Sequence, residues 1–139
     1  MSDTDRERDA EVAWTVEYNE ELEIVELKLV GKLSGAELQE SAASRIALGQ
    51  EHDVTRFVIN AADLISPRST TMSIYEIAAN TYSRSNQRRD TRIAVIVPTS
   101  PDSEWIIQFY EDLCVNRGWR VRMCDDRVAA LAWLHEHVD

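Results

Sequence analysis

The chain has 139 residues, of which 44% are hydrophobic and 29% are charged, and its formal net charge is -10. This size and composition predict one globular domain with a hydrophobic core of its own. No apolar run approaches the roughly 20 residues that a membrane span needs. The first residues also lack the basic-then-apolar order of a secretory signal, so we expect a cytoplasmic protein. A nucleic-acid partner is not expected, because such binding needs clustered basic side chains facing phosphates.

The negative charge is concentrated at the N-terminus. Ten acidic residues but only two arginines lie among residues 1–26. Residues 1–11 are almost wholly polar and show no periodicity, which predicts a disordered acidic tail followed by a single domain over residues 12–139. The chain also has 13 arginines but only two lysines. This acidic, lysine-poor composition fits either a protein kept soluble in concentrated salt or an acidic tail in a genome biased toward arginine codons.

The cysteines and histidines offer little chemistry. Cys114 and Cys124 have no C-x-x-C spacing and are expected to be free, inert thiols in a reducing cytoplasm. His135 and His137 are two residues apart on a predicted helix, so they diverge by about 200° at about 3.6 residues per turn. This divergence predicts surface side chains rather than zinc ligands. We expect neither a metal site nor a cofactor.

The first predicted elements are two strands joined as an antiparallel hairpin. Every second residue from Val12 to Tyr18 is apolar, which is the period of a strand with one buried face. After a short turn at residues 19–21, the apolar phase of the next strand slips between Ile24 and Val25. This slip predicts a β-bulge at that point.

Strand and helix then alternate. Ser34 and Glu37 have the capping-box spacing and begin a first helix that Gly49 is expected to help end. A third strand over residues 56–60 is apolar throughout, which predicts burial on both faces of a parallel sheet. Residues 61–72 are rich in Ser, Thr and Pro and predict a loop.

The capping-box spacing recurs at Ser73, which is expected to begin the second helix. A fourth strand over residues 92–97 is again apolar and central. Ser100 is the expected cap of the third helix, which Gly118 closes. The fifth strand, residues 120–124, alternates charged and apolar side chains and predicts a sheet edge.

A final helix completes the pattern. Asp125 or Asp126 caps it. Its inward-facing residues are expected to be Val128, Leu131, Leu134 and Val138. The same periodicity places Trp14, Trp105 and Trp133 in the core and does not settle the position of Trp119.

This order of elements supports a resemblance to a known family. The segment Cys114-Val-Asn-Arg-Gly-Trp119-Arg-Val-Arg122 and the stretch Ala129-Ala-Leu-Ala-Trp133-Leu that follows it resemble uncharacterised bacterial single-domain members of the SpoIIAA-like (STAS-like) family. The resemblance covers about residues 12–138. It implies an α/β fold in which an antiparallel leading strand and four β-α units form a mostly parallel five-stranded sheet with four helices.

The same resemblance implies a non-catalytic protein-interaction or regulatory module. In the branch of the family that phosphorylation switches, a Ser or Thr follows an Asp at the end of the third strand and begins the next helix. The matching stretch here is Asn60-Ala61-Ala62-Asp63. The resemblance therefore implies a module that lacks this phosphoacceptor.

Motifs of the common enzyme classes are absent from the sequence. The four glycines are scattered, so no phosphate-binding loop is formed, and there is no G-x-S-x-G nucleophile elbow. A phosphorelay receiver needs an Asp at the end of its third strand and a Lys after its fifth. Here Asn60 occupies the first of these places and no lysine follows Lys32. We expect a protein that is not an enzyme.

A candidate site follows from the predicted topology. Ligands of open parallel sheets bind beyond the carboxyl ends of the strands, because loops and helix N-termini converge there. That edge supplies hydroxyl, amide and carboxylate groups. The candidate partner or ligand residues are Ser34, Asn60, Asp63, Ser66, Thr99, Ser100 and Asp125. Ordinary helix caps and turns are the alternative explanation for the same residues.

Two functions of different class remain open. One is a protein-interaction module. The other is a carrier of a lipid or other small apolar ligand, because lipid-transfer domains share the same β-α superhelix. An enclosed apolar cavity of several hundred Å³ favours the carrier, whereas a filled core favours the module.

A homodimer is also expected. The third and fourth strands are apolar on both faces, and successive right-handed crossovers tend to place helices on one face of a sheet. The other face would then need cover from the first strand and a second subunit.

Overall fold

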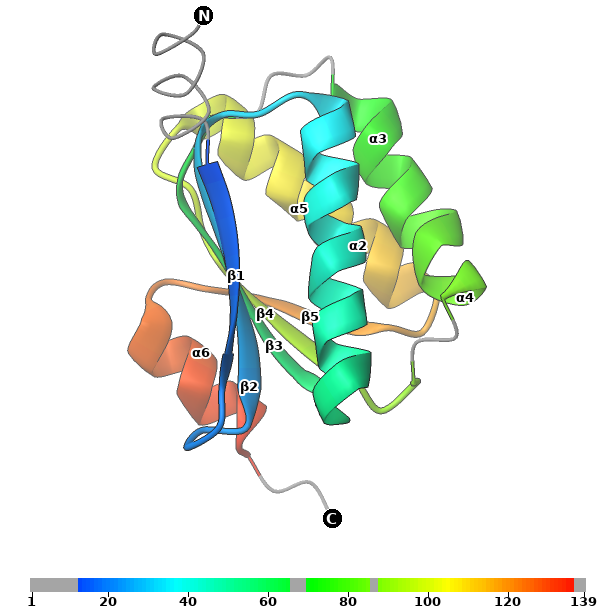
Figure 1. Cartoon of the computed structure of the whole chain (residues 1–139). Coiled ribbons are helices and arrows are strands. Elements are labelled where there is room, and N and C mark those ends of the chain that lie inside the picture. The colour runs from blue at the N-terminus through cyan, green and yellow to red at the C-terminus, as the bar shows by residue number, and fades with distance from the viewer. Residues whose placement is uncertain (1–12, 66–69, 86–87, 137–139) are drawn as a thin grey trace, which may run out of the picture.

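The computed structural model describes residues 13–65, 70–85 and 88–136 (Figure 1). The acidic tail predicted for residues 1–11, the candidate Ser66 and the helix residue Val138 lie outside the described residues. No helix in the described part of the chain is both long and apolar enough to cross a membrane.

Five strands form one mixed sheet in the order β1-β2-β3-β4-β5. The first pair is antiparallel and the other pairs are parallel, as the sequence predicted. The strands are β1 (Ala13–Asn19), β2 (Ile24–Lys32), β3 (Arg56–Ile65), β4 (Arg92–Ile96) and β5 (Arg120–Cys124). The helices are α2 (Gly35–His52), α3 (Thr71–Glu76), the π-helical turn η2 (Ile77–Thr81), α4 (Tyr82–Arg84), α5 (Pro101–Asn116) and α6 (Arg127–Leu134).

Helices cover both faces of the sheet. The helices α2, α3 and α5 lie on one face, and α6 lies on the other (Figure 1). Beneath α6 is a second, smaller core that includes Ile24, Val58, Ala94, Ile96 and Leu134. The reason given for a homodimer, an uncovered second face, therefore does not hold, because α6 supplies the cover. The homodimer itself stays a prediction that sedimentation can test.

The β-bulge lies in a different strand from the predicted one. The pairing of β1 with β2 is continuous, and Ile24 and Val25 are both buried, on opposite faces of the sheet. The register shift falls instead between β2 and β3, where Ala61 and Ala62 lie opposite the single residue Leu29. Burial on both faces, rather than a bulge, explains the change of phase in the sequence.

The third strand is longer than predicted, and the following helix begins earlier. β3 continues to Ile65, so residues 61–65 of the predicted loop are strand. Thr70 is the N-cap of α3, and the capping box expected at Ser73 does not form. The Ser73 side chain instead packs against α2, so closely that a Cβ atom built on Gly35 would collide with it.

Two predicted core positions are placed differently. Val128 is 78% exposed on α6, and Trp105 is 42% exposed on α5, although both were expected to face inward. Trp119, which the pattern left unsettled, is buried in the main core. Trp14 and Trp133 pack against the two cores and are partly buried, as predicted.

Gly49 packs against the sheet and does not end a helix. α2 continues to His52, and its C-cap Asp53 takes the left-handed conformation with φ 54°. Gly49 is buried where α2 crosses β3. A Cβ atom built on it would lie 2.8 Å from Cε2 of Phe57, which is closer than non-bonded carbon atoms approach. The missing side chain thus allows α2 to lie close to the sheet.

This contact predicts the sign of a stability change. On helix propensity alone, Gly49→Ala would raise the free energy of unfolding by about 1 kcal/mol. We expect the cost of the clash with Phe57 to exceed this gain. Denaturant unfolding of Gly49→Ala should then show a free energy of unfolding that is about 1–3 kcal/mol lower. Ala47→Gly, at an exposed position of the same helix, measures propensity alone as a control. A more stable Gly49→Ala protein would contradict the prediction. If the Phe57 ring causes the loss of stability, combining Phe57→Leu with Gly49→Ala should reduce it.

Candidate functional site

Two of the candidate residues at the carboxyl edge of the sheet are helix caps. Ser34 is the N-cap of α2, where its Oγ accepts a hydrogen bond from the Glu37 amide at 3.2 Å and its own amide donates to Glu37 Oε1 at 2.8 Å. This is the predicted capping box. Ser100 is the N-cap of α5, with Pro101 at the first position. Helix capping, which the sequence left open as the alternative explanation, accounts for the position of both residues.

Asn60 and Thr99 meet at the bulge of β3. Asn60 Oδ1 accepts a hydrogen bond from the Ala62 amide at 3.2 Å, which satisfies an amide that the bulge takes out of the sheet. The Thr99 amide donates to the carbonyl of Ala62 at 3.3 Å. These contacts hold the loop after β4 against β3.

The two candidate carboxylates are not assembled with these groups. Asp63 and Asp125 are exposed, and the neighbouring Asp126 is the residue that caps α6, through a 2.8 Å bond from the Ala129 amide. No group of three or more His, Cys, Asp or Glu side chains that could hold a metal ion occurs among the described residues. The predicted edge thus mainly joins loops to strands and caps helices.

A different surface carries exposed apolar side chains. We call it the α3–α5 face and define it by Met72 and Tyr75 of α3 and Trp105 and Phe109 of α5. Met72 is 73% exposed and Tyr75 is 38% exposed. The rings of Trp105 and Phe109 stack at 5.7 Å with an interplanar angle of 3°. α3 and α5 pack side by side, so the face spans two helices.

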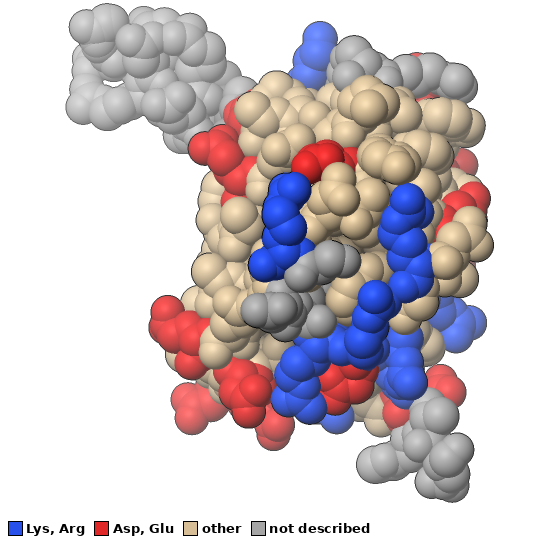
Figure 2. Space-filling model, turned by 90° about the vertical axis from the view of Figure 1, so that its right-hand side faces the viewer, with Lys and Arg blue, Asp and Glu red and all other residues tan. Residues whose placement is uncertain are grey.

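Arginine side chains lie beside this face. The Arg117 guanidinium lies 5.4 Å from the centroid of the Tyr75 ring. Arg89 donates to the Arg117 carbonyl at 2.6 Å and lies over the Trp119 ring at 3.9 Å. Arg84 pairs with Glu76 at 3.1 Å. Viewed from the side of α3 and α4, the surface has a mostly uncharged upper part above a band of basic side chains (Figure 2).

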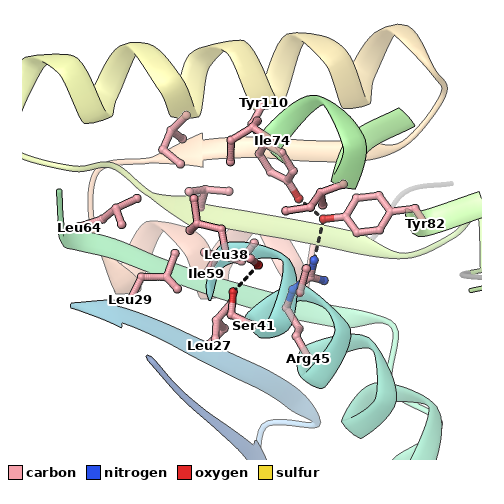
Figure 3. A pocket seen from close by; sticks show the side chains of 14 residues that line it. Leu27, Leu29, Leu38, Ser41, Arg45, Ile59, Leu64, Ile74, Tyr82 and Tyr110 are labelled. Atoms are coloured by element: carbon pink, nitrogen blue, oxygen red, sulfur yellow. Dashed lines mark hydrogen bonds between the residues drawn. The ribbon is translucent and has the colours of Figure 1, made fainter. Parts of the chain in front are cut away.

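A polar cluster lies buried behind the helices of this face. Arg45 of α2 is 1% exposed, and its Nη2 donates to the Tyr82 hydroxyl at 2.6 Å. The Tyr82 hydroxyl is in turn hydrogen-bonded to the Tyr110 hydroxyl of α5. The cluster lines an apolar cavity between the helices and the sheet (Figure 3). Three helical segments are therefore linked through their side chains inside the core.

The π-helical turn is what brings Tyr82 into this cluster. The Tyr82 amide donates to the Ile77 carbonyl, five residues earlier. In a regular α-helix, Thr81 would lie seven residues, or two turns, above the buried Ile74. The extra residue of the π turn rotates Tyr82 into that inward position instead, which is fully buried.

Arg45 was not recognised from the sequence, although a signal was present. It follows Leu38 by seven residues and so lies on the same inward stripe as Leu38, Ala42 and Ile46. An arginine at such a position must be buried or must distort the helix. The π turn has no comparable signal, because the packing of Tyr82 against Arg45 and Tyr110 determines it.

Burial changes the ionisation of the cluster. Burial lowers the pKa of the Arg45 guanidinium, but Tyr82 and Tyr110 offset it, so the net shift is upward and the group stays charged. Burial raises the pKa of Tyr82 despite the opposing effect of Arg45, and it raises the pKa of Tyr110 well above its ordinary value. Both tyrosines are therefore neutral near pH 7.

Solved structures with the same architecture match nearly the whole chain. An anti-sigma factor antagonist from Mycobacterium paratuberculosis is 13% identical, with a TM-score of 0.60 over 89% of this chain and 94% of that one. The anti-sigma factor antagonist SpoIIAA, in its unphosphorylated form, is 19% identical, with a TM-score of 0.61 over 91% of this chain and 100% of that one. The chain has the SpoIIAA-like fold.

A third match supports the same assignment. An uncharacterised DUF3478 protein with a SpoIIAA-like fold from Shewanella loihica is 16% identical, with a TM-score of 0.53 over 88% of this chain and 92% of that one. No family model matches the sequence, and no curated protein matches it. The likeness is therefore one of fold, and it confirms the architecture that the sequence predicted.

Within this SpoIIAA-like fold, both cysteines are free and buried, as predicted. Burial raises the pKa of the Cys114 thiol from its ordinary value of 9.0 to about 12, although Tyr110 and Arg45 oppose the shift. The thiolate is the reactive form of cysteine. Cys114 is therefore an inert core residue rather than a nucleophile.

The raised pKa of Cys114 predicts how stability depends on pH. Between pH 9 and about pH 12 the unfolded thiol loses its proton while the folded thiol keeps it. The unfolded state then binds fewer protons, so the free energy of unfolding should fall as the pH rises, by about 1.4 kcal/mol per pH unit for this group. Cys114→Ala should reduce that slope in urea titrations between pH 9 and 10, and Cys124→Ala should retain the Cys114 contribution. An unchanged slope in Cys114→Ala would contradict the assignment.

Proposed function

We propose that the chain is a non-catalytic regulatory module that docks a protein partner on the α3–α5 face. The observation that carries the proposal is the exposure of Met72, Tyr75 and Trp105 on adjacent helices. Grouped apolar side chains on the surface of a soluble domain mark interaction sites. Aromatic residues, methionine and arginine are also the residue types enriched in protein interfaces.

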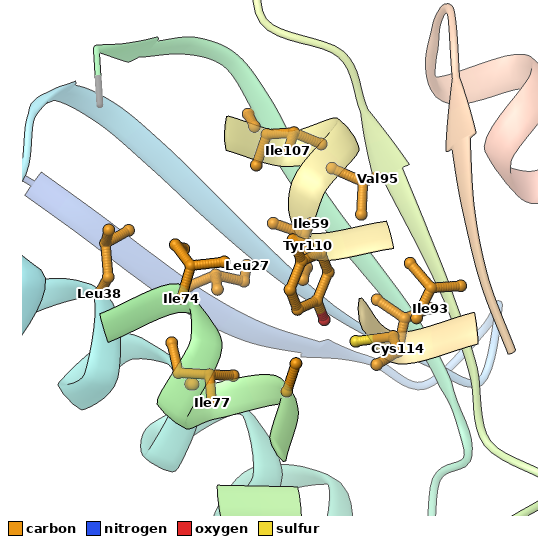
Figure 4. Packing of buried hydrophobic residues seen from close by; sticks show 14 of the residues in the cluster. Leu27, Leu38, Ile59, Ile74, Ile77, Ile93, Val95, Ile107, Tyr110 and Cys114 are labelled. Atoms are coloured by element: carbon orange, nitrogen blue, oxygen red, sulfur yellow. The ribbon is translucent and has the colours of Figure 1, made fainter. Parts of the chain in front are cut away.

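The filled core favours a docking module over a carrier. The cavity beneath the helices has a volume of about 40 Å³, far below the several hundred Å³ of a small-molecule pocket. Side chains of the main cluster, including Leu27, Ile59, Ile77 and Val95, occupy the space between the sheet and the helices (Figure 4). A lipid chain would have to displace these residues.

The chemistry of the α3–α5 face indicates the character of its partner. Its apolar centre suits an apolar side chain from a helix or loop of the partner, and Arg117 beside Tyr75 suits a carboxylate at the rim. Two of the solved structures with this fold are anti-sigma factor antagonists. On this basis we propose an anti-sigma factor as the partner.

We also propose that a phosphate does not control this docking. The stretch Asn60-Ala61-Ala62-Asp63 has no hydroxyl and lies inside β3 rather than before a helix. Thr70 and Thr71 lie at the start of α3, whose N-cap Thr70 is three residues before the predicted cap Ser73. However, Thr70 is only 3% exposed, and Ser73 lies against Gly35 with no room for a phosphate.

Substitutions on the α3–α5 face test the docking proposal. Tyr75→Ser and Trp105→Ala should each weaken partner binding about tenfold or more, because buried aromatic residues dominate interface energies. Isothermal titration against each purified anti-sigma factor of the same genome measures the loss. Val128→Ser changes an apolar residue that is even more exposed, on α6 on the opposite face of the sheet, and should bind as the native chain does.

Two results would contradict this proposal. One is native affinity in both variants, which would place the docking site elsewhere on the fold. The other is the absence of binding to any anti-sigma factor, which would reject the proposed partner class. Melting curves by circular dichroism establish that each variant remains folded.

Phosphate mapping tests the second part of the proposal. In protein isolated from its native cell, mass spectrometry across residues 60–73 should find no more than traces of phosphate. A substantial phosphate on Thr71 or a neighbouring hydroxyl, together with gain or loss of the bound partner, would contradict the proposal that phosphate does not control docking. Thr71→Val then shows whether binding follows that hydroxyl.

A further inference from the structure

β1 is an edge strand whose outer side is open. It is the first strand of the sheet and pairs only with β2, so its second row of backbone N–H and C=O groups faces away from the sheet (Figure 1). In the part of the chain that the structure describes, no side chain is hydrogen-bonded to an amide of this strand. An open edge of this kind is a surface on which a strand of another chain can pair.

Side chains close the opposite edge of the sheet, β5. The Met123 amide of that strand donates to Glu111 Oε2 at 3.0 Å, so a carboxylate occupies the edge. Arg120 and Arg122 are exposed on the same strand. Charged side chains on an edge strand oppose pairing with another chain. β1 has no such protection, because its one charged residue is Glu17 and its pairing with β2 is free of bulges.

The residues of β1 suit a strand inside a sheet. Trp14, Val16 and Tyr18 are partly buried against the main core, on the face that α2 covers. Thr15 and Glu17 are exposed on the other face, and α6 packs on that face over β3, β4 and β5. Aromatic and β-branched residues are the types most enriched in strands. β1 therefore has the composition of a paired strand but a partner on one side only.

We propose that the β1 strands of two copies of this chain pair edge to edge, antiparallel, about a two-fold axis at Val16. The two five-stranded sheets then form one continuous sheet. Val16 is the middle residue of the strand, so all seven residues of β1 have a partner in this register. A two-fold contact of this kind is closed, so the assembly stops at a dimer.

The strand is complementary to itself in this register. Its pairs are Trp14 opposite the partner's Tyr18, Val16 opposite the partner's Val16, and Thr15 opposite the partner's Glu17. Aromatic and β-branched pairs stabilise a sheet, whereas like charges directly opposite each other destabilise it. Moving the axis to Glu17 would place two glutamates opposite each other. The axis at Val16 avoids that repulsion.

Two substitutions of Thr15 test the interface. Because the partner's Glu17 lies opposite, Thr15→Lys should lower the dissociation constant of the dimer and Thr15→Glu should raise it, each by about fivefold, since a dimer contains two such pairs. Sedimentation velocity at low ionic strength, from micromolar to submillimolar concentration, measures both against the native chain. Within one copy the residue opposite Thr15 is Lys28, which favours the glutamate and opposes the lysine. A change in fold stability therefore cannot produce the expected order.

A matched pair of variants controls for charge alone. Val128→Lys and Val128→Glu make the same changes at an exposed position of α6 and should leave association unchanged. A native chain that stays monomeric over the whole concentration range would overturn the proposal. So would a dimer that Thr15→Lys and Thr15→Glu affect equally or in the reverse order, because its interface would then lie elsewhere.

Cross-linking locates the axis. Residues directly opposite each other in antiparallel strands have Cα atoms about 4.5–5.5 Å apart, within the reach of a disulfide. Val16→Cys should therefore give a disulfide-linked dimer on mild oxidation with diamide. Glu17→Cys should not, because its two copies are two residues out of register, and the native Cys114 and Cys124 are buried. Cross-linking of Val16→Cys that is no greater than that of Glu17→Cys would overturn the proposed register.

Discussion

The hydrogen-bonded link from Arg45 through Tyr82 to Tyr110 is the interaction on which the helical layer depends. α2, α4 and α5 each contribute one side chain to it, and all three side chains are buried. Burying a guanidinium is costly unless its donors are satisfied, so the link constrains where the three segments lie relative to one another. Because the link requires the Tyr82 side chain to point inward, it also accounts for the π turn at Ile77–Thr81, which rotates that side chain inward.

The same helical stretch is attached to α2 at three places. Ser73 packs against Gly35 near its start, Tyr82 accepts from Arg45, and the Ser85 carbonyl accepts from Gln50 Nε2 at 2.7 Å near its end. With its inward positions committed to these contacts, the stretch presents Met72 and Tyr75 outward. The exposure of apolar residues on α3 thus follows from how the helix is held.

The sequence predicted the architecture but not the surface that we assign to docking. Apolar runs, hairpin alternation and the capping box at Ser34 are local signals, and each led to the observed element. Ser73 and Gly49 have equally clear local signals, a cap and a helix stop, but tertiary contacts with Gly35 and Phe57 determine their roles. Trp105 has the inward phase of its helix pattern and yet lies on the surface. Local periodicity does not encode such contacts between elements.

A rigid attachment of α3 has a consequence for recognition. A partner that binds a flexible helix must offset the entropy of ordering it, whereas a helix already fixed at several points presents its side chains in place. Met72 and Tyr75 follow the Thr70 cap, with Met72 directly before the Ser73 contact and Tyr75 between that contact and the Arg45–Tyr82 link. Any change that loosens that link would therefore weaken the proposed docking through mobility of α3, without altering a single residue of the face itself.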